Sequence, residues 1–180
     1  MSPSAQRDYA TRQRPQIAVV PLTAAFAEVA SALHEEGFED CWDADAIIRL
    51  LDVPGAFGFL AFRPWNEANN DKDEPLGFVL IQSVLDEAEI VTIVVGRQAR
   101  QSGVARKLLS AVFDRLRDKR IGRLLLEVAE DNAPAIALYL QYGFEEVGRR
   151  KNYYRRKSGR EVDALVMEHT HGHCVLGWGD

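Results

Sequence analysis

A strand, a helix and a second strand follow one another between Ile90 and Val128, and this unit constrains the fold most. The run Ile90–Val95 is almost entirely β-branched, which is typical of a central strand covered on both faces. Leu124–Val128 is the second strand. Strands joined through a helix in this way lie parallel with a right-handed crossover. The residues between them recur at helical spacing and form one apolar stripe: Val104, Leu108, Leu109, Val112, Phe113 and Leu116.

The remaining segments complete a mixed sheet. They predict strands over 17–20, 57–62, 76–84, 145–149 and 162–167, and helices over 23–36, from Asp43 to just before Pro54, and between Asn132 and Gly143. The prediction is an α/β (α+β) fold, with a mostly antiparallel sheet of six to seven strands and helices on both faces. Residues 1–14 are expected to be a flexible lead-in, 15–168 a single domain and 169–180 a His-rich tail.

Charge and composition exclude several classes of protein. The net charge of −5 and pI of about 5.4 argue against nucleic-acid binding, which needs a basic face. Mild acidity suits an amine substrate, but a solvated surface is the expected interpretation of the charge balance alone. No apolar run approaches the ~20 residues of a membrane helix, and the polar N-terminal segment does not resemble a signal peptide. With two cysteines, Cys41 and Cys174, we expect a reducing, cytoplasmic location.

The loop Arg100–Ala105, between the central strand and the amphipathic helix, is a candidate anion site. Gly103 lets the backbone approach a ligand closely, and the amides at a helix start have no partner within the helix. Arg97, Arg100 and Arg106 add positive charge, so a diphosphate fits. The spacing matches neither the dinucleotide nor the P-loop signature. The alternative is a polar turn in which Gly103 only begins the helix.

Two residues are candidates for acid–base catalysis. Glu127 interrupts the apolar strand, where a carboxylate costs free energy unless it is paired or its raised pKa is used. It is therefore a candidate general base, unless it points to solvent at the strand end. Tyr139 follows Ile136 on the same helical face. A phenol with a pKa near ~10 is able to protonate a departing thiolate. The alternative for Tyr139 is a plain core aromatic.

Two motifs in the right order carry a resemblance. Arg100–Ala105 resembles the R/Q-x-x-G-x-G/A signature of the GNAT superfamily of N-acetyltransferases. Asn132–Phe144 is similar to that superfamily's second cofactor motif, N-x-x-A-I-x-L-Y-x-x-x-G-F. Within the superfamily the chain most resembles the RimI branch, the ribosomal-protein-alanine N-acetyltransferases. Residues 126–128, 149–154 and 163–167 support that branch, and the resemblance covers roughly 17–167.

The resemblance implies a GNAT fold and direct transfer of an acetyl group from acetyl-CoA to an amine in a ternary complex. It implies that Glu127 is the base and Tyr139 the acid for the CoA thiolate, without a metal. The implied cofactor contacts are the backbone of Ile93, Val94 and Val95 for the pantetheine arm and thioester, a pyrophosphate loop of Arg100, Gln101, Ser102, Gly103, Val104, Ala105 and Arg106, and Asn132.

By the same resemblance the acceptor is a protein N-terminus, that of the eighteenth small-subunit ribosomal protein. A base removes the proton of an α-amine, whose pKa is near ~7.7–8.0, more easily than that of a lysine side chain, whose pKa is near ~10.4. Candidate acceptor-side residues are Trp42, Gln82, Tyr153 and Tyr154, although the two tyrosines are equally expected to pack on the closing hairpin. The family's Pro-Trp pair is replaced here by a Cys-Trp pair. A lysine or small-amine acceptor, or a non-catalytic acyl-CoA-binding module, remains an alternative.

The C-terminal segment is rich in possible metal ligands. Glu168, His169, His171, His173 and Cys174 lie close together in the sequence. Such a tract is able to bind Zn²⁺ or Cu²⁺. A solvated terminus is the expected interpretation.

Overall fold

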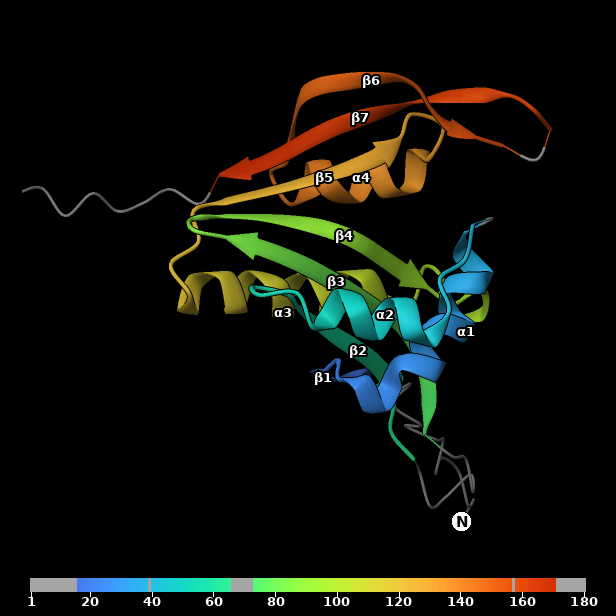
Figure 1. Cartoon of the computed structure of the whole chain (residues 1–180), viewed down its shortest axis with the longest axis vertical. Coiled ribbons are helices and arrows are strands. Elements are labelled where there is room, and N and C mark those ends of the chain that lie inside the picture. The colour runs from blue at the N-terminus through green and yellow to red at the C-terminus, as the bar shows by residue number, and fades with distance from the viewer. Residues whose placement is uncertain (1–15, 39, 66–72, 157, 171–180) are drawn as a thin grey trace, which may run out of the picture.

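The computed structural model describes residues 16–38, 40–65, 73–156 and 158–170; the expected lead-in and all but two residues of the expected tail lie outside them. Its strands form one seven-stranded sheet in the order β1-β2-β3-β4-β5-β7-β6 (Figure 1). The strands are β1 (Ala18–Pro21), β2 (Phe57–Arg63), β3 (Glu74–Val84), β4 (Glu87–Val95), β5 (Arg123–Ala129), β6 (Glu145–Arg155) and β7 (Glu161–Thr170). The helices are α1 (Ala27–Gly37), α2 (Ala44–Leu51), α3 (Val104–Asp118) and α4 (Ala133–Gln141), with 3₁₀ turns η1 (Ala24–Phe26) and η2 (Arg97–Ala99).

The pairing confirms the predicted mixed sheet. The strands β4 and β5 are parallel, and every other neighbouring pair is antiparallel. The parallel pair is the one predicted from the strand-helix-strand unit. The last strand is longer than its apolar pattern indicates: β7 runs to Thr170, and His169, assigned to the tail on the sequence, pairs with Leu124 in the sheet.

Helices cover both faces of the sheet, as predicted. The apolar stripe of α3 and the buried side of α4 pack on one face, together with Leu124 and Leu126 of β5. On the other face α1 and α2 enclose a second cluster with Phe78 of β3 and Val94 of β4. Figure 1 shows α3 on one side of β3 and β4 and the pair α1–α2 on the other.

Capping side chains fix where two helices begin. Asp43 accepts a hydrogen bond from the Ala46 N–H at 2.7 Å and starts α2. Asn132 accepts from the Ala135 N–H at 3.3 Å and starts α4. These are the two caps predicted from the sequence. Gly143, just past α4, has φ of +79°, which permits the left-handed backbone that ends the helix.

The central sheet opens into a fork between β4 and β5. Their parallel pairing runs only from Glu87–Arg123 to Ile90–Leu126. Beyond that level β5 continues alongside β7, and β4 continues alongside β3. At the same level β4 carries an extra residue, because Thr92 pairs with Leu80 and Ile90 with Ile81. Figure 1 shows the two strands diverging toward the end of the sheet where α1 lies.

Candidate active site

The fork leaves one edge of β4 without a β partner in the described structure. Ile93, Val94 and Val95 pair with β3 but not with β5. An unpaired strand edge presents N–H and C=O groups that an extended ligand can bind as a neighbouring strand would. The three residues predicted to hold the pantetheine arm therefore lie where an amide-containing chain fits.

The loop after β4 forms the second part of the site. It runs through η2 to Gly103, which starts α3 with φ of +93° and without a side-chain cap. A Cβ built on Gly103 meets nothing within 4 Å, so the space before the helix amides is open. Ser102 Oγ donates to the Ala99 carbonyl at 2.6 Å, and Arg100 Nε donates to the Val95 carbonyl at 3.5 Å. The loop is thus held from within, and its open side fits a pyrophosphate.

The rest of the predicted cofactor segment anchors the helices around this loop. Arg106 donates to Gln141 Oε1 at 2.5 Å, and its carbonyl accepts from the Tyr142 hydroxyl at 3.1 Å. These contacts join the first turn of α3 to the end of α4. Val104 is buried, whereas Gln101 is exposed with φ of +61°. Asn132 is exposed at the start of α4, where its carboxamide oxygen already serves as the cap.

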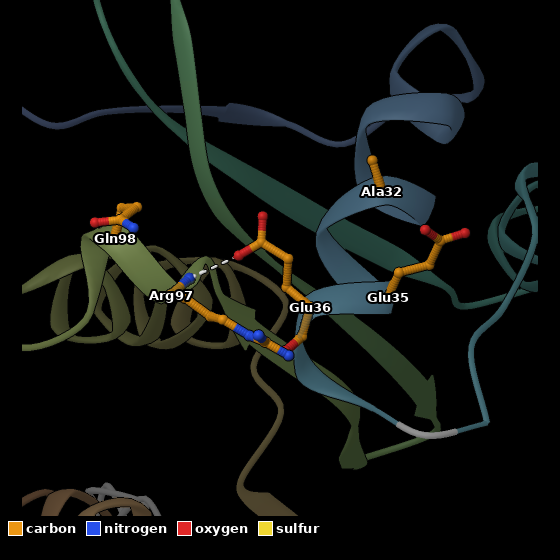
Figure 2. A pocket seen from close by; sticks show the side chains of 5 residues that line it. All are labelled: Ala32, Glu35, Glu36, Arg97 and Gln98. Carbon is orange, nitrogen blue, oxygen red and sulfur yellow. Dashed lines mark hydrogen bonds between the residues drawn. The ribbon is translucent and has the colours of Figure 1, made fainter.

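A contact from α1 holds the loop from the outside. Figure 2 shows the Glu36 carboxylate directed at the start of η2, with Glu35 and Ala32 of the same helix turned elsewhere around the same pocket. The Arg97 backbone N–H donates to Glu36 Oε2 at 2.7 Å, and Arg97 Nε donates to the Glu36 carbonyl at 3.3 Å. Helix α1 and the loop after β4 are therefore directly connected.

Glu127 is the first residue of β5 beyond the paired part of the fork. Its neighbours Leu126 and Val128 enter the α3–α4 core, so the Glu127 side chain lies on the opposite face. That side chain is 16% exposed, and its Oε1 forms an ion pair with Arg150 Nε at 2.9 Å. The alternative of a solvent-directed carboxylate at a strand end is therefore wrong. Sequence reasoning called for a partner but did not find Arg150, which reaches Glu127 from β6 across β7.

Two tyrosines of β6 surround the same carboxylate. A hydrogen bond from the Tyr153 hydroxyl to Glu127 raises the pKa of Tyr153. The Tyr154 hydroxyl donates to the Glu127 carbonyl at 3.5 Å, and burial, followed by the charge of Glu127, raises the pKa of Tyr154 to about 12. Both tyrosines thus reach Glu127 rather than only packing on the hairpin. The Arg150 guanidinium lies over the Tyr153 ring, 5.4 Å from its centroid.

Tyr139 lies on the α3–α4 side of the sheet. It is 5% exposed, and its ring packs against Phe144 at a centroid distance of 5.5 Å. Burial raises the pKa of Tyr139, and the neighbouring Tyr154 raises it further. The phenol therefore keeps its proton at physiological pH. Tyr154 is the residue that links Tyr139 electrostatically to the surroundings of Glu127.

The other two predicted acceptor-side residues are each held by a structural contact. Gln82 Nε2 donates to the Pro54 carbonyl at 2.7 Å and so supports the turn between α2 and β2. Trp42 lies between α1 and α2, where its ring stacks on His34 at a centroid distance of 4.5 Å. The structure thus gathers Glu127, Tyr153 and Tyr154 into one cluster, which Gln82 does not join.

Two structural findings concern metals and membranes. No group of three or more His, Cys, Asp or Glu residues among the described residues is placed to hold a metal ion. His171, His173 and Cys174 of the predicted tract lie outside those residues. In the same part of the chain, no helix combines the length and apolarity needed to cross a bilayer.

An open β edge and an amide-lined loop fit the class of enzymes that bind an extended anionic ligand, and the ion-paired carboxylate of Glu127 lies beside them at the fork. The model of the Acetyltransferase (GNAT) family matches residues 24–144, and the chain belongs to this family. It is therefore an acetyl-CoA-dependent N-acetyltransferase, as the two motifs predicted.

Two relatives and one solved structure show which members of the family this chain is similar to. The [ribosomal protein bS18]-alanine N-acetyltransferase of Escherichia coli K12 is 39% identical over 138 residues, which cover 67% of this chain and 92% of that relative. The protein of the same name from Haemophilus influenzae is 36% identical over 143 residues, covering 77% and 96%. The crystal structure of the ribosomal-protein-S18-alanine N-acetyltransferase from Escherichia coli aligns with a TM-score of 0.79 and 25% identity, covering 92% of this chain and 100% of that one.

Proposed function

We propose that this chain acetylates the N-terminal α-amine of a protein, and that its acceptor is the alanine terminus of the small-subunit ribosomal protein S18. The observation that carries the proposal is the position of Glu127, an ion-paired carboxylate at the level where β4 and β5 separate. The names of the similar proteins support the acceptor. The proposal includes a cytoplasmic location, because the relatives are named for a ribosomal substrate.

The proposed roles follow from which atoms need protons. Bound acetyl-CoA supplies a thioester carbon that a neutral amine attacks. Glu127 takes the ammonium proton, directly or through one water, because only the neutral amine is nucleophilic. Arg150 holds the Glu127 carboxylate in place at 2.9 Å. Tyr139, kept protonated by burial, supplies the proton for the departing thiolate, and the nitrogen of the tetrahedral intermediate gives up its second proton as the amide forms, which restores the phenol. Both proton transfers use side chains, so no metal is part of the proposal.

The choice of an α-amine rests on acid–base chemistry. A protein N-terminus has a pKa near ~7.7–8.0, whereas a lysine has one near ~10.4. At neutral pH a substantial fraction of the α-amine is therefore already neutral, but very little of the lysine is.

Mass spectrometry of synthetic peptides tests the acceptor. Each peptide carries an internal lysine and begins with free alanine, serine or methionine, or with a blocked residue. We expect one acetyl group at the free alanine terminus and none on the blocked peptide. Acetylation at lysine, or of no peptide, contradicts the α-amine assignment and favours a small amine or a purely binding role.

The variant Glu127→Gln tests the base. We expect kcat at neutral pH to fall by about 100-fold or more. The loss shrinks as the pH rises above the acceptor pKa, since the amine is then neutral without help. Glu89→Gln is the matched control: Glu89 pairs with Leu125, which places it on the Glu127 face of the sheet without contact to that cluster. Equal losses in the two variants, or a loss independent of pH, contradict the role of Glu127.

A further inference from the structure

The proposed reaction does not use His34, a buried imidazole in α1. It is 2% exposed, although histidine is a titratable residue and the helix lies at the protein surface. Its ring is stacked between two aromatic rings, Phe38 and Trp42, each at a centroid distance of 4.5 Å and within 15° of parallel. Phe78 of β3 lies beneath at 6.3 Å. Three aromatic side chains thus enclose one histidine.

The imidazole also satisfies the backbone where the chain turns from α1 into α2. The Trp42 N–H donates to His34 Nδ1 at 3.1 Å, so Nδ1 carries no proton in this arrangement. The Ser31 hydroxyl donates to the Trp42 carbonyl at 2.9 Å. Both backbone polar groups of Trp42 are therefore held by side chains of α1. Asp43 follows at once and begins α2. An apolar residue at position 34 can stack, but it leaves the Trp42 N–H without this acceptor.

This stack stands beside the opening of the sheet. A Cβ built on Gly37 comes within 3.1 Å of Val94 Cγ1, so the end of α1 lies directly over the end of β4. Glu36 contacts the start of η2 at the same end. Val94 belongs to the stretch of β4 that has left β5. Phe38, which is 42% exposed, and the partly buried Trp42 therefore lie at the end of α1 that covers Val94, on the sheet face that also carries the Glu127 side chain.

We propose that His34 is a positioning residue for the acceptor: it fixes Trp42 and Phe38 as one wall of the groove that binds the first residues of the acceptor peptide. The inference rests on the proposed function, because it needs a peptide acceptor on the α1–α2 side. His34 itself does not touch the acceptor. It acts through the hydrogen bond to Trp42 and through the stack.

The test is a substitution that keeps the stack and removes the acceptor nitrogen. In His34→Phe we expect KM for an alanine-terminated peptide to rise by about tenfold, since the partly buried Trp42 N–H loses its partner and Trp42 shifts. We expect kcat at saturating peptide and KM for acetyl-CoA to stay within a factor of two. A general loss of folding changes the peptide KM, kcat and the KM for acetyl-CoA together. Thermal melting of each variant measures such a loss separately.

A matched control is available on the other face of the sheet. His169 of β7 is also packed among aromatic rings, with Phe113 at 4.9 Å and Phe144 at 5.5 Å. The exchange His169→Phe makes the same chemical change away from the α1–α2 side. We expect it to leave the peptide KM unchanged. A rise in peptide KM equal to that of His34→Phe overturns the inference.

A double-mutant cycle shows whether His34 acts through Trp42. Trp42→Ala alone is expected to raise the peptide KM, and the addition of His34→Phe is expected to raise it no further. Independent, multiplicative effects overturn the inference, as does an unchanged peptide KM in Trp42→Ala. If the wild-type protein acetylates no peptide, the proposed function fails. An enzyme that acetylates peptides with the same KM after His34→Phe refutes only the role of His34.

Discussion

Two glycines make it possible to separate cofactor binding from backbone strain. Gly103 at the start of α3 has φ of +93°, and Gly159 in the β6–β7 turn has φ of +79°. A Cβ built on either meets nothing within 4 Å. Neither Gly→Ala exchange creates a clash, so each costs only the left-handed backbone conformation, about 1–2 kcal/mol. We expect the melting temperature of both variants to fall by about 2–8 °C.

The two variants differ in what lies in front of the new methyl group. At Gly103 it enters the space before the α3 amides, where the pyrophosphate of acetyl-CoA is proposed to lie. The loss of one hydrogen bond to a charged group costs about 1.5–3 kcal/mol, which predicts a KM for acetyl-CoA raised at least about tenfold. Steady-state kinetics at saturating acceptor measure this. If Gly103→Ala and Gly159→Ala change that KM equally, the loop is not the pyrophosphate site.

Two further predictions concern α1 and the buried histidines. Glu36→Ala removes the acceptor that holds the cofactor loop, so KM for acetyl-CoA is expected to rise by roughly 2–10-fold, whereas Glu35→Ala, one residue away and without this contact, leaves it unchanged. Equal kinetics in the two variants contradict the coupling. Burial lowers the pKa of His34 and of His169 below the ordinary 6.5. The unfolded chain therefore binds more protons as the pH falls below 6.5, and the free energy of unfolding decreases. Each group contributes at most about 1.4 kcal/mol per pH unit. Chemical denaturation at several pH values between 6.5 and 4.5 measures how the free energy of unfolding changes with pH. The lower limit is the ordinary glutamate pKa, below which carboxylates titrate as well. An unchanged pH dependence in the variant His34→Phe/His169→Phe refutes this explanation.

The sequence predicted the elements whose patterns are local. The parallel pair β4–β5 follows from two apolar strands joined by an amphipathic helix, and the starts of α2 and α4 follow from Asp43 and Asn132. Each of these signals lies in one continuous segment of sequence, which is a single helical turn for the two caps and residues 90–128 for the parallel pair. The first residue of β6, Glu145, was predicted correctly, but its extension from 149 to Arg155 was not predictable in this way, because most of its residues are exposed on both faces of an edge strand. Such a strand carries no apolar alternation.

The site was predictable in its residue types but not in its partners. A charged residue within the apolar strand 124–128 indicated that Glu127 needed compensation, and Arg150 supplies it at 2.9 Å. That contact depends on the register of β6 on β7, which contains two irregularities near this level. The contact of Gln82 was likewise not predictable from its neighbours in the sequence, because its amide donates to the Pro54 carbonyl, 28 residues away.

The fork and the candidate base have one structural origin. The last parallel pair is Ile90–Leu126, so continued pairing would join Val91 to Glu127. Val91 is instead the extra residue of the β4 irregularity, without a partner in the β3 register. A single inserted residue turns β4 away at the level of Glu127. This change both frees the β4 edge for an extended ligand and separates the two strands beside the carboxylate. In the sequence, Val91 is one member of an unbroken β-branched run, and the register shift that gives it this role is visible only in the pairing of β4 with β3.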